Sequence, residues 1–284
     1  MSSDYLQEQF TKFTATISKL NLYKNEARVV FDSQDKAIRS FHEQLPEWSL
    51  QKEQGRPYFL HYQSPSTGGD LIVSPITNKL ADQLELNALQ QLKTYHWLLV
   101  EAYEAFVKFV GKAYAHCGLE GLNLWQRPHK WSRDGSRKLD NYNTGDKPYG
   151  QLKAFREGSE HFARYETNSP TGRNYRVVFV MMEKLRHVIV HNGGYSDNFK
   201  RLIDKMQGEL KDMDIRVVKE YAALHFVPHR GSDLIDLFES PVLDENGVET
   251  GAYLDILLGF FRTVVEYAQL IMECIQAHPR SVST

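Results

Sequence analysis

Residues 184–193 read Lys184-Leu185-Arg186-His187-Val188-Ile189-Val190-His191-Asn192-Gly193, and a second glycine follows at position 194. The stretch ends a helix that the apolar spacing predicts over about 174–192, because asparagine and glycine accept the dihedral angles that stop a helix. It places an arginine and two histidines in the last two turns. A guanidinium binds a phosphate anion and an imidazole moves a proton near neutral pH. The stretch therefore indicates chemistry on a phosphate group.

The helical spacing limits what this stretch can do alone. Arg186 and His191 are five positions apart, so they lie roughly 140° apart around the helix axis. His191 falls in the final turn, where unpaired carbonyl groups favour a protonated imidazole. A complete site is easier to build with a neighbouring helix, or with the same helix of a second subunit.

The order arginine, polar residue, three residues, histidine and asparagine resembles the signature of the HEPN superfamily (higher eukaryote and prokaryote nucleotide-binding domains). The resemblance covers about 80–277. It implies a mostly α-helical protein, with a HEPN-like helical bundle, an added N-terminal segment and a small hairpin. It also implies a homodimer that meets through the motif helix and uses no metal or cofactor. The implied activity is an endoribonuclease, of the kind found among toxins and phage-defence proteins.

Each residue of the motif has a role in that resemblance. Arg186 would hold and polarise the scissile phosphate, and His191 would assist attack by the ribose 2′-hydroxyl or protonate the leaving oxygen. His187 occupies the polar position after the arginine. Asn192 would orient His191 or contact phosphate, and Glu101 of the preceding long helix would orient Arg186. Such an enzyme leaves cyclic phosphate ends and does not cut DNA.

Other interpretations of the same residues stay open. Histidine, asparagine and two glycines also make a plain helix end, with a surface arginine nearby. Glu183, His187 and His191 follow one another at four-residue steps and share a helical face, as ligands of Zn²⁺ or Fe²⁺ do, although the adjacent arginine would repel a cation. The alternative function is a non-catalytic helical interaction or scaffold protein with the same fold.

A second candidate region is the basic and aromatic segment that follows residue 124. Residues 125–176 carry 11 Lys and Arg against 6 Asp and Glu. Basic side chains track phosphates and a tryptophan can stack on a base, so RNA contacts are expected here. A solvated loop anchored by its tryptophans is the simpler alternative. The candidate RNA-binding residues are Arg127, Lys130, Trp131, Arg133, Arg137 and Lys138.

The composition is that of a globular protein, with 42% hydrophobic and 25% charged residues among 284. A net charge of −2 gives no global basic field, although a local patch is sufficient for RNA. The only two cysteines, Cys117 and Cys274, are far apart and indicate neither zinc nor a disulfide framework. The polar start lacks the features of a signal peptide, and charges interrupt both apolar stretches. We expect a cytoplasmic protein that does not span a membrane and has RNA and a regulatory protein as partners.

The pattern along the chain predicts an N-terminal helical segment and connector over 1–75 and a helical domain over 76–284. Two short β-like runs at 58–60 and 71–73 predict a hairpin, and Asn246-Gly247 predicts a second one. Residues 214–230 fit helix or strand, and 119–150 fit a long loop. The other expected helices are 4–50, 76–117, 149–165, 197–212 and 252–277.

Overall fold

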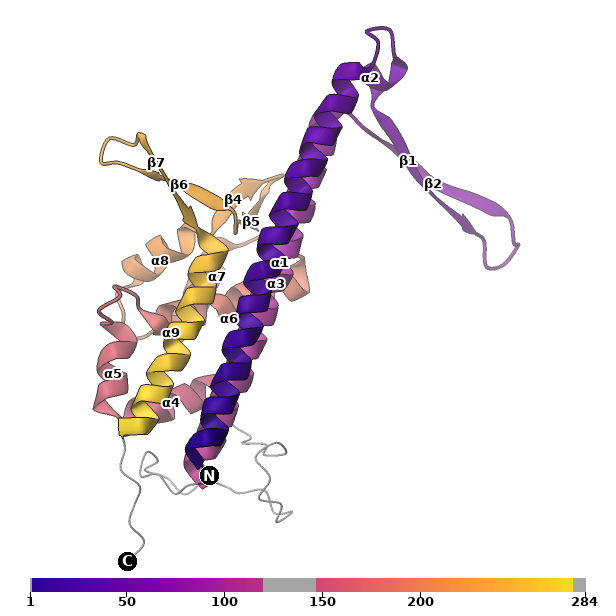
Figure 1. The fold of residues 1–284 in the computed structure, drawn as a ribbon. Coiled ribbons are helices and arrows are strands. Elements are labelled where there is room, and N and C mark those ends of the chain that lie inside the picture. Colours follow the sequence, from indigo (N-terminus) through magenta and orange to yellow (C-terminus); the bar gives the residue numbers. More distant parts are fainter. Residues whose placement is uncertain (1, 120–146, 278–284) are drawn as a thin grey trace, which may run out of the picture. The chain divides into compact units, whose positions relative to one another are not determined.

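The computed structural model describes residues 2–119 and 147–277. Within these ranges the protein is mostly helical, as expected, with nine helices and three small antiparallel sheets (Figure 1). The helices are α1 (Ser2–Gln44), α2 (Leu50–Gln54), α3 (Leu80–Leu119), α4 (Pro148–Gly158), α5 (Glu160–Thr167), α6 (Tyr175–Asn192), α7 (Phe199–Glu209), α8 (Ile215–Ala223) and α9 (Ile256–Ala277). The strands are β1 (Arg56–Gln63), β2 (Asp70–Asn78), β3 (Tyr195–Ser196), β4 (Phe226–His229), β5 (Ser232–Ile235), β6 (Glu239–Leu243) and β7 (Glu249–Asp255).

The chain forms two compact units. One consists of Met1–Leu22 with Tyr95–Thr284, and the other is Tyr23–Thr94. The long helices α1 and α3 each contribute to both units. The division expected from the sequence, into 1–75 and 76–284, stays a prediction.

The smaller unit, Tyr23–Thr94, contains the end of α1, the start of α3 and the first hairpin. Strands β1 and β2 pair antiparallel from Arg56 and Asn78 to Gln63 and Asp70, with an irregularity between Tyr58 and Leu60, which confirms the hairpin expected there. Gly55 leads into β1 with φ 82°, and a Cβ atom there would lie 2.3 Å from the Asn78 carbonyl oxygen. Glycine is therefore required where the two ends of the hairpin meet. The Asn87 amide donates to the Phe31 carbonyl at 2.9 Å and ties α3 to α1.

The larger unit has an aromatic core between α3, α6 and α9. Phe106 of α3 stacks on Tyr267 of α9, with ring centres 5.3 Å apart, and meets Phe179 of α6 at 5.7 Å. All three side chains are almost fully buried. At the start of the chain Phe13 of α1 stacks on Phe109 of α3 at 5.3 Å. Burial of these rings, together with that of the surrounding aliphatic side chains, contributes non-directional stabilisation to the unit.

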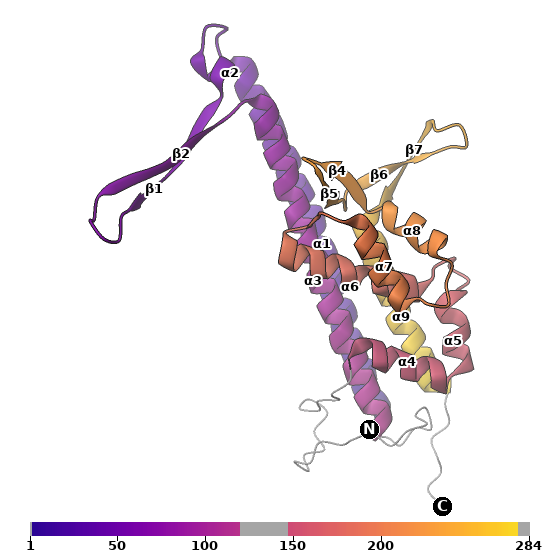
Figure 2. The same ribbon diagram turned by 180° about the vertical axis from the view of Figure 1, so that it is seen from behind.

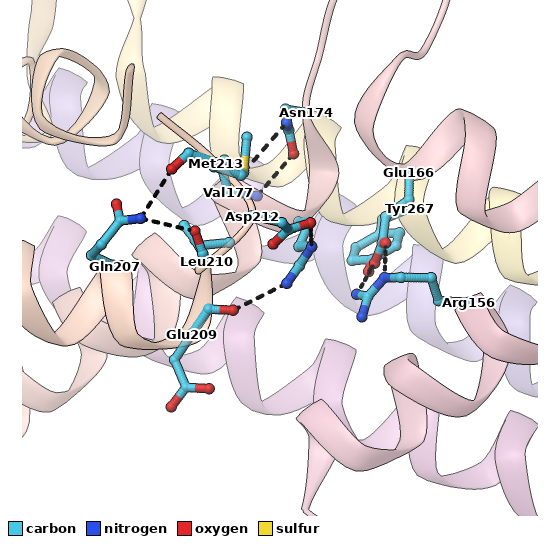
Figure 3. Close-up of polar contacts among 11 residues, drawn as sticks. Arg156, Glu166, Asn174, Val177, Gln207, Glu209, Leu210, Asp212, Met213 and Tyr267 are labelled. Atoms are coloured by element: carbon cyan, nitrogen blue, oxygen red, sulfur yellow. Dashed lines mark hydrogen bonds and ion pairs between the residues drawn. The ribbon is translucent and has the colours of Figure 1, made fainter. Parts of the chain in front are cut away.

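A buried carboxylate organises the helices beneath α6. Glu166 of α5 has no exposed surface, and it pairs with Arg156 of α4 and accepts a hydrogen bond from the Tyr267 hydroxyl (Figure 3). The carboxylate and the Arg156 guanidinium both raise the cost of separating α4, α5 and α9, because a buried charge that loses its partner is strongly unfavourable. This cluster holds together α5 and α9, against which α6 packs.

Several helix boundaries differ from those expected: α1 ends at Gln44 rather than near residue 50, and α3 begins at Leu80 because residues 70–78 form β2. The single helix expected over 149–165 is two helices, α4 and α5, separated at Ser159, whose side chain caps α5 by accepting from the Phe162 amide at 3.2 Å. The last helix begins at Ile256 rather than Ala252, because residues 249–255 pair with β6 instead. The hairpin expected at Asn246-Gly247 is confirmed, with Gly247 at φ 78°.

The ambiguous segment 214–230 is helix and then strand, since α8 is followed directly by β4. Strand β5 lies between β3 and β4 in a small antiparallel sheet. In the described part of the chain, no helix combines the length and the apolar character that crossing a membrane requires.

Candidate functional site at the end of helix α6

Helix α6 begins and ends where its sequence predicts. The Asn174 side chain caps the first turn by accepting from the Val177 amide at 3.1 Å (Figure 3). Gly193 ends the helix in the left-handed conformation, with φ 60°. Leu185, Val188 and Ile189 are buried, so the apolar face of the last turns is anchored in the larger unit. The polar side chains of the motif are left at the surface.

Gly194 fixes the end of α6 against α3. Its φ is 88°, and a Cβ atom there would lie 2.4 Å from Cε1 of His96, a buried residue of α3. His96 Nε2 is 2.9 Å from the Ile235 carbonyl oxygen, and the Ile235 amide donates to the Gly194 carbonyl at 3.0 Å. Gly194 therefore does more than help to end the helix: the absence of a side chain allows His96 of α3 and Ile235 of β5 to pack closely against the end of α6.

Arg186 is turned towards α3. Its Nε and Nη2 atoms lie 3.0 and 2.8 Å from Oε1 of Glu104. The expected partner, Glu101, is one helical turn away and exposed. The arginine and glutamate side chains are 36% and 49% exposed, so the ion pair is accessible to solvent. An incoming anion can therefore compete with Glu104 for the guanidinium.

His187 and His191 lie together on a different side of α6. Their ring centres are 4.5 Å apart, as the four-residue spacing allows, and both side chains are exposed. Partial burial, His191 and Lys205 of α7 lower the pKa of His187 below 6.5, and Glu183 acts in the opposite direction. The His187 ring is therefore neutral at pH 7 and can accept a proton.

A cleft runs between the last turns of α6 and helix α7, which lies next to α6 when the molecule is seen from behind (Figure 2). Its volume is about 540 Å³, and His187 and Asn192 line it on the α6 side. Arg201 and Lys205 line it on the α7 side. Neither cation forms an ion pair with any residue in the described ranges, so both are available to an anion. Arg186 and His191 do not line this cleft.

The alternative metal-binding set does not assemble. The Glu183 carboxylate accepts from the Tyr149 hydroxyl at 3.0 Å and lies 2.5 Å from the Lys184 ammonium group. Burial and this carboxylate raise the pKa of Tyr149, so the hydroxyl keeps its proton and donates. Among the residues described, no group of three or more His, Cys, Asp and Glu side chains is arranged to hold a metal ion.

The sequence pattern found α6 but missed three neighbours. Glu104 belongs to α3, far from residues 184–193 in the sequence, whereas Arg201 and Lys205 belong to α7, which follows α6 after the short strand β3. The surplus of basic residues after position 124 pointed to a different region. The RNA-binding residues expected there, Arg127, Lys130, Trp131, Arg133, Arg137 and Lys138, lie outside the described residues.

Comparison with known proteins adds no independent indication of what this site does. No protein-family model, no curated protein and no solved structure matches the chain.

Proposed function

We propose that this protein is a metal-independent endoribonuclease of the HEPN type, built on a HEPN-like helical bundle within residues 76–284. One observation supports it above the others: the paired imidazoles of His187 and His191 at the exposed end of α6 lie beside a cleft that carries Arg201 and Lys205. Two histidines next to cations are the groups that proton transfer at a phosphodiester requires.

The proposed reaction is attack by a ribose 2′-hydroxyl on the adjacent phosphorus. The neutral His187 ring accepts the hydroxyl proton as the new P–O2′ bond forms. The His191 ring, in its protonated form, gives a proton to the 5′-oxygen as the P–O5′ bond breaks. The products are a 2′,3′-cyclic phosphate and a 5′-hydroxyl. His187 gains the proton that the 2′-hydroxyl loses, and His191 loses the proton that the 5′-oxygen gains.

Cations hold the phosphate during this step. Arg201 and Lys205 face the cleft without ion-pair partners among the described residues and neutralise the non-bridging oxygens. Arg186 joins them by exchanging Glu104 for the phosphate, which the exposure of that pair allows. Asn192 lines the cleft and supplies an amide to a sugar or phosphate oxygen.

A homodimer through the end of α6 is part of the proposal. Val190 is 39% exposed at this end, although its neighbours Val188 and Ile189 are buried. A second copy of α6 would cover this apolar side chain and bring a second set of histidines close. Val190→Asp should then lower the dimer fraction in sedimentation velocity. An unchanged sedimentation profile would remove the motif helix from the interface.

The test is cleavage of a mixed RNA pool by the full-length protein in EDTA. We expect cyclic phosphate ends, and no cleavage at a position that carries a 2′-deoxy sugar. His187→Ala, His191→Ala and Arg186→Ala should each abolish cleavage, and the double change Arg201→Ala with Lys205→Ala should weaken it. Lys200→Ala is the matched control, because Lys200 is exposed on the same helix but does not line the cleft.

The outcomes separate the proposal from its alternatives. Cleavage that survives all the histidine variants comes from a contaminant or from another site, and refutes the assignment. Intact RNA with the wild-type protein at high concentration would favour the non-catalytic interaction protein. Cleavage that EDTA stops would show that a metal carries the chemistry.

A further inference from the structure

A second cavity lies away from the histidine pair, between the first half of α6, α8 and the start of α9. Its volume is about 330 Å³, within the range of small-molecule sites. Val177, Val178, Ile256 and Phe260 give it apolar walls. Its residues all belong to the larger unit. Nothing in the proposed ribonuclease reaction uses it.

The cavity contains a polar group that the fold leaves unsatisfied. His225, which follows α8, is 5% exposed and lines the cavity, and neither of its ring nitrogens has a hydrogen-bond partner in the described part of the chain. Burial lowers the pKa of His225 to about 4. The ring is therefore neutral at pH 7 and presents one N–H donor and one nitrogen acceptor. Buried polar groups of this kind are normally paired.

The surroundings of His225 favour a flat partner. Its ring meets Tyr221 at 5.1 Å in an edge-on arrangement and Phe260 at 4.9 Å. No hydrogen bond joins the Tyr221 hydroxyl to another described residue, so it is a further polar contact in the wall. Aromatic walls accept planar rings with favourable edge and face contacts.

A glycine keeps the cavity open. Gly259 is in the first turns of α9 and lines the cavity, and a Cβ atom there would meet no heavy atom within 4 Å outside its own helix. Glycine is a poor helix former, and a larger residue at this position would fill the space without a backbone clash. A side chain at this position would therefore not disturb the packing of α9, and the space that the glycine leaves open is compatible with a bound molecule.

We propose that this cavity binds a small, uncharged heteroaromatic molecule that carries a hydrogen-bond donor and an acceptor on one ring system. Its flat face would lie among Tyr221, Phe260 and the valines of α6, and its polar atoms would pair with His225. The ligand is a separate occupant from RNA, and the site stands whether or not the protein cleaves RNA.

The test uses two bicyclic probes of nearly the same shape. Benzimidazole carries both a donor and an acceptor, and indene carries neither. Binding of each to the full-length protein is measured by ligand-observed NMR at pH 7.5. We expect benzimidazole to bind about tenfold more tightly than indene, since the shape term is shared and only the hydrogen bonds differ.

Three variants locate the binding. His225→Phe keeps the ring packing and should reduce benzimidazole to the affinity of indene. Gly259→Phe should block both probes by filling the cavity. Gly208→Phe makes the same change at an exposed glycine of α7 that also has open space around it, and should leave binding unchanged. Circular dichroism verifies that each variant is folded.

The same data can overturn the proposal. Equal affinities for the two probes in the wild-type protein would show that His225 makes no contact. Binding that persists in folded Gly259→Phe would place the probes elsewhere. Absence of binding at millimolar benzimidazole would exclude a small heteroaromatic ligand, and would leave the apolar rim of Val217, Leu224 and Leu254 as a surface for a polypeptide instead.

Discussion

Arg186 contacts a single carboxylate oxygen of Glu104 through both Nε and Nη2, at 3.0 and 2.8 Å. The contact joins α6 to α3 and holds the motif arginine away from the cleft that His187 lines. Because both side chains are more than a third exposed, the pair is held loosely, and the guanidinium can turn to a stronger anionic partner. Arg186 therefore has two contacts that can be tested separately: the ion pair with Glu104 and the phosphate contact that we propose.

Glu104→Gln and Arg186→Ala test this separation. An exposed ion pair contributes about 0–1 kcal/mol, so each variant should change the free energy of unfolding in urea by less than about 1 kcal/mol. Glu104→Gln should cleave RNA at least as fast as wild type, because the arginine is released. Arg186→Ala should not cleave. A loss of several kcal/mol in Arg186→Ala would instead make the arginine a structural residue.

Gly194 offers a test of the geometry at the end of α6. Gly194→Ala should destabilise the protein by about 2–4 kcal/mol, because the left-handed backbone costs about 1 kcal/mol and the contact with His96 adds an overpacking term. Gly172→Ala is the control: its φ is 73°, but no atom lies within 4 Å of the added carbon. The difference between the two variants in urea denaturation measures the clash alone. Equal losses would mean that His96 moves aside freely.

Glu166 provides a prediction about the stability of the larger unit. Glu166→Gln should lower the free energy of unfolding by about 3 kcal/mol, because it leaves the Arg156 charge without its buried partner. Glu157→Gln, on the neighbouring helix, removes only an exposed contact with Lys153 at 3.4 Å and should cost less than about 0.5 kcal/mol. Thermal and urea unfolding check both values. Similar losses in the two variants would contradict a special role for the buried carboxylate.

Structural features that depend on residues close together in the sequence were predictable. The stop at Asn192-Gly193 and the Asn246-Gly247 hairpin follow from residues that accept left-handed backbone angles, and both are present. The two short β-like runs at 58–60 and 71–73 likewise predicted the β1–β2 hairpin. The helix expected over 76–117 is also present as α3 (Leu80–Leu119).

The remaining features depend on contacts between distant residues. Residues 252–255 have helix-compatible side chains, but pairing with β6 draws them into a strand. The break between α4 and α5 is an exception: the Ser159 hydroxyl caps α5 only three residues away, and the expected helix over 149–165 did not take this local signal into account. At the site, Glu104, Arg201 and Lys205 approach α6 through tertiary packing, which is why spacing on one helix could identify the histidines but not their partners.

His225 predicts a specific pH dependence of stability. Its pKa is lowered from 6.5 to about 4 by burial, so the unfolded chain binds a proton between these values and the folded protein does not. The contribution of His225 to the free energy of unfolding is fully present above pH 6.5. It is lost as the pH falls, by about 2 kcal/mol between pH 7.5 and pH 5. His225→Phe lacks this linkage, so wild type should lose that much more stability than the variant over the same interval. The subtraction cancels the titration of carboxylates common to both proteins. An equal loss in the free energy of unfolding for the two proteins over this pH interval would show that the imidazole is already hydrated. The cavity would then admit water freely to its nitrogens.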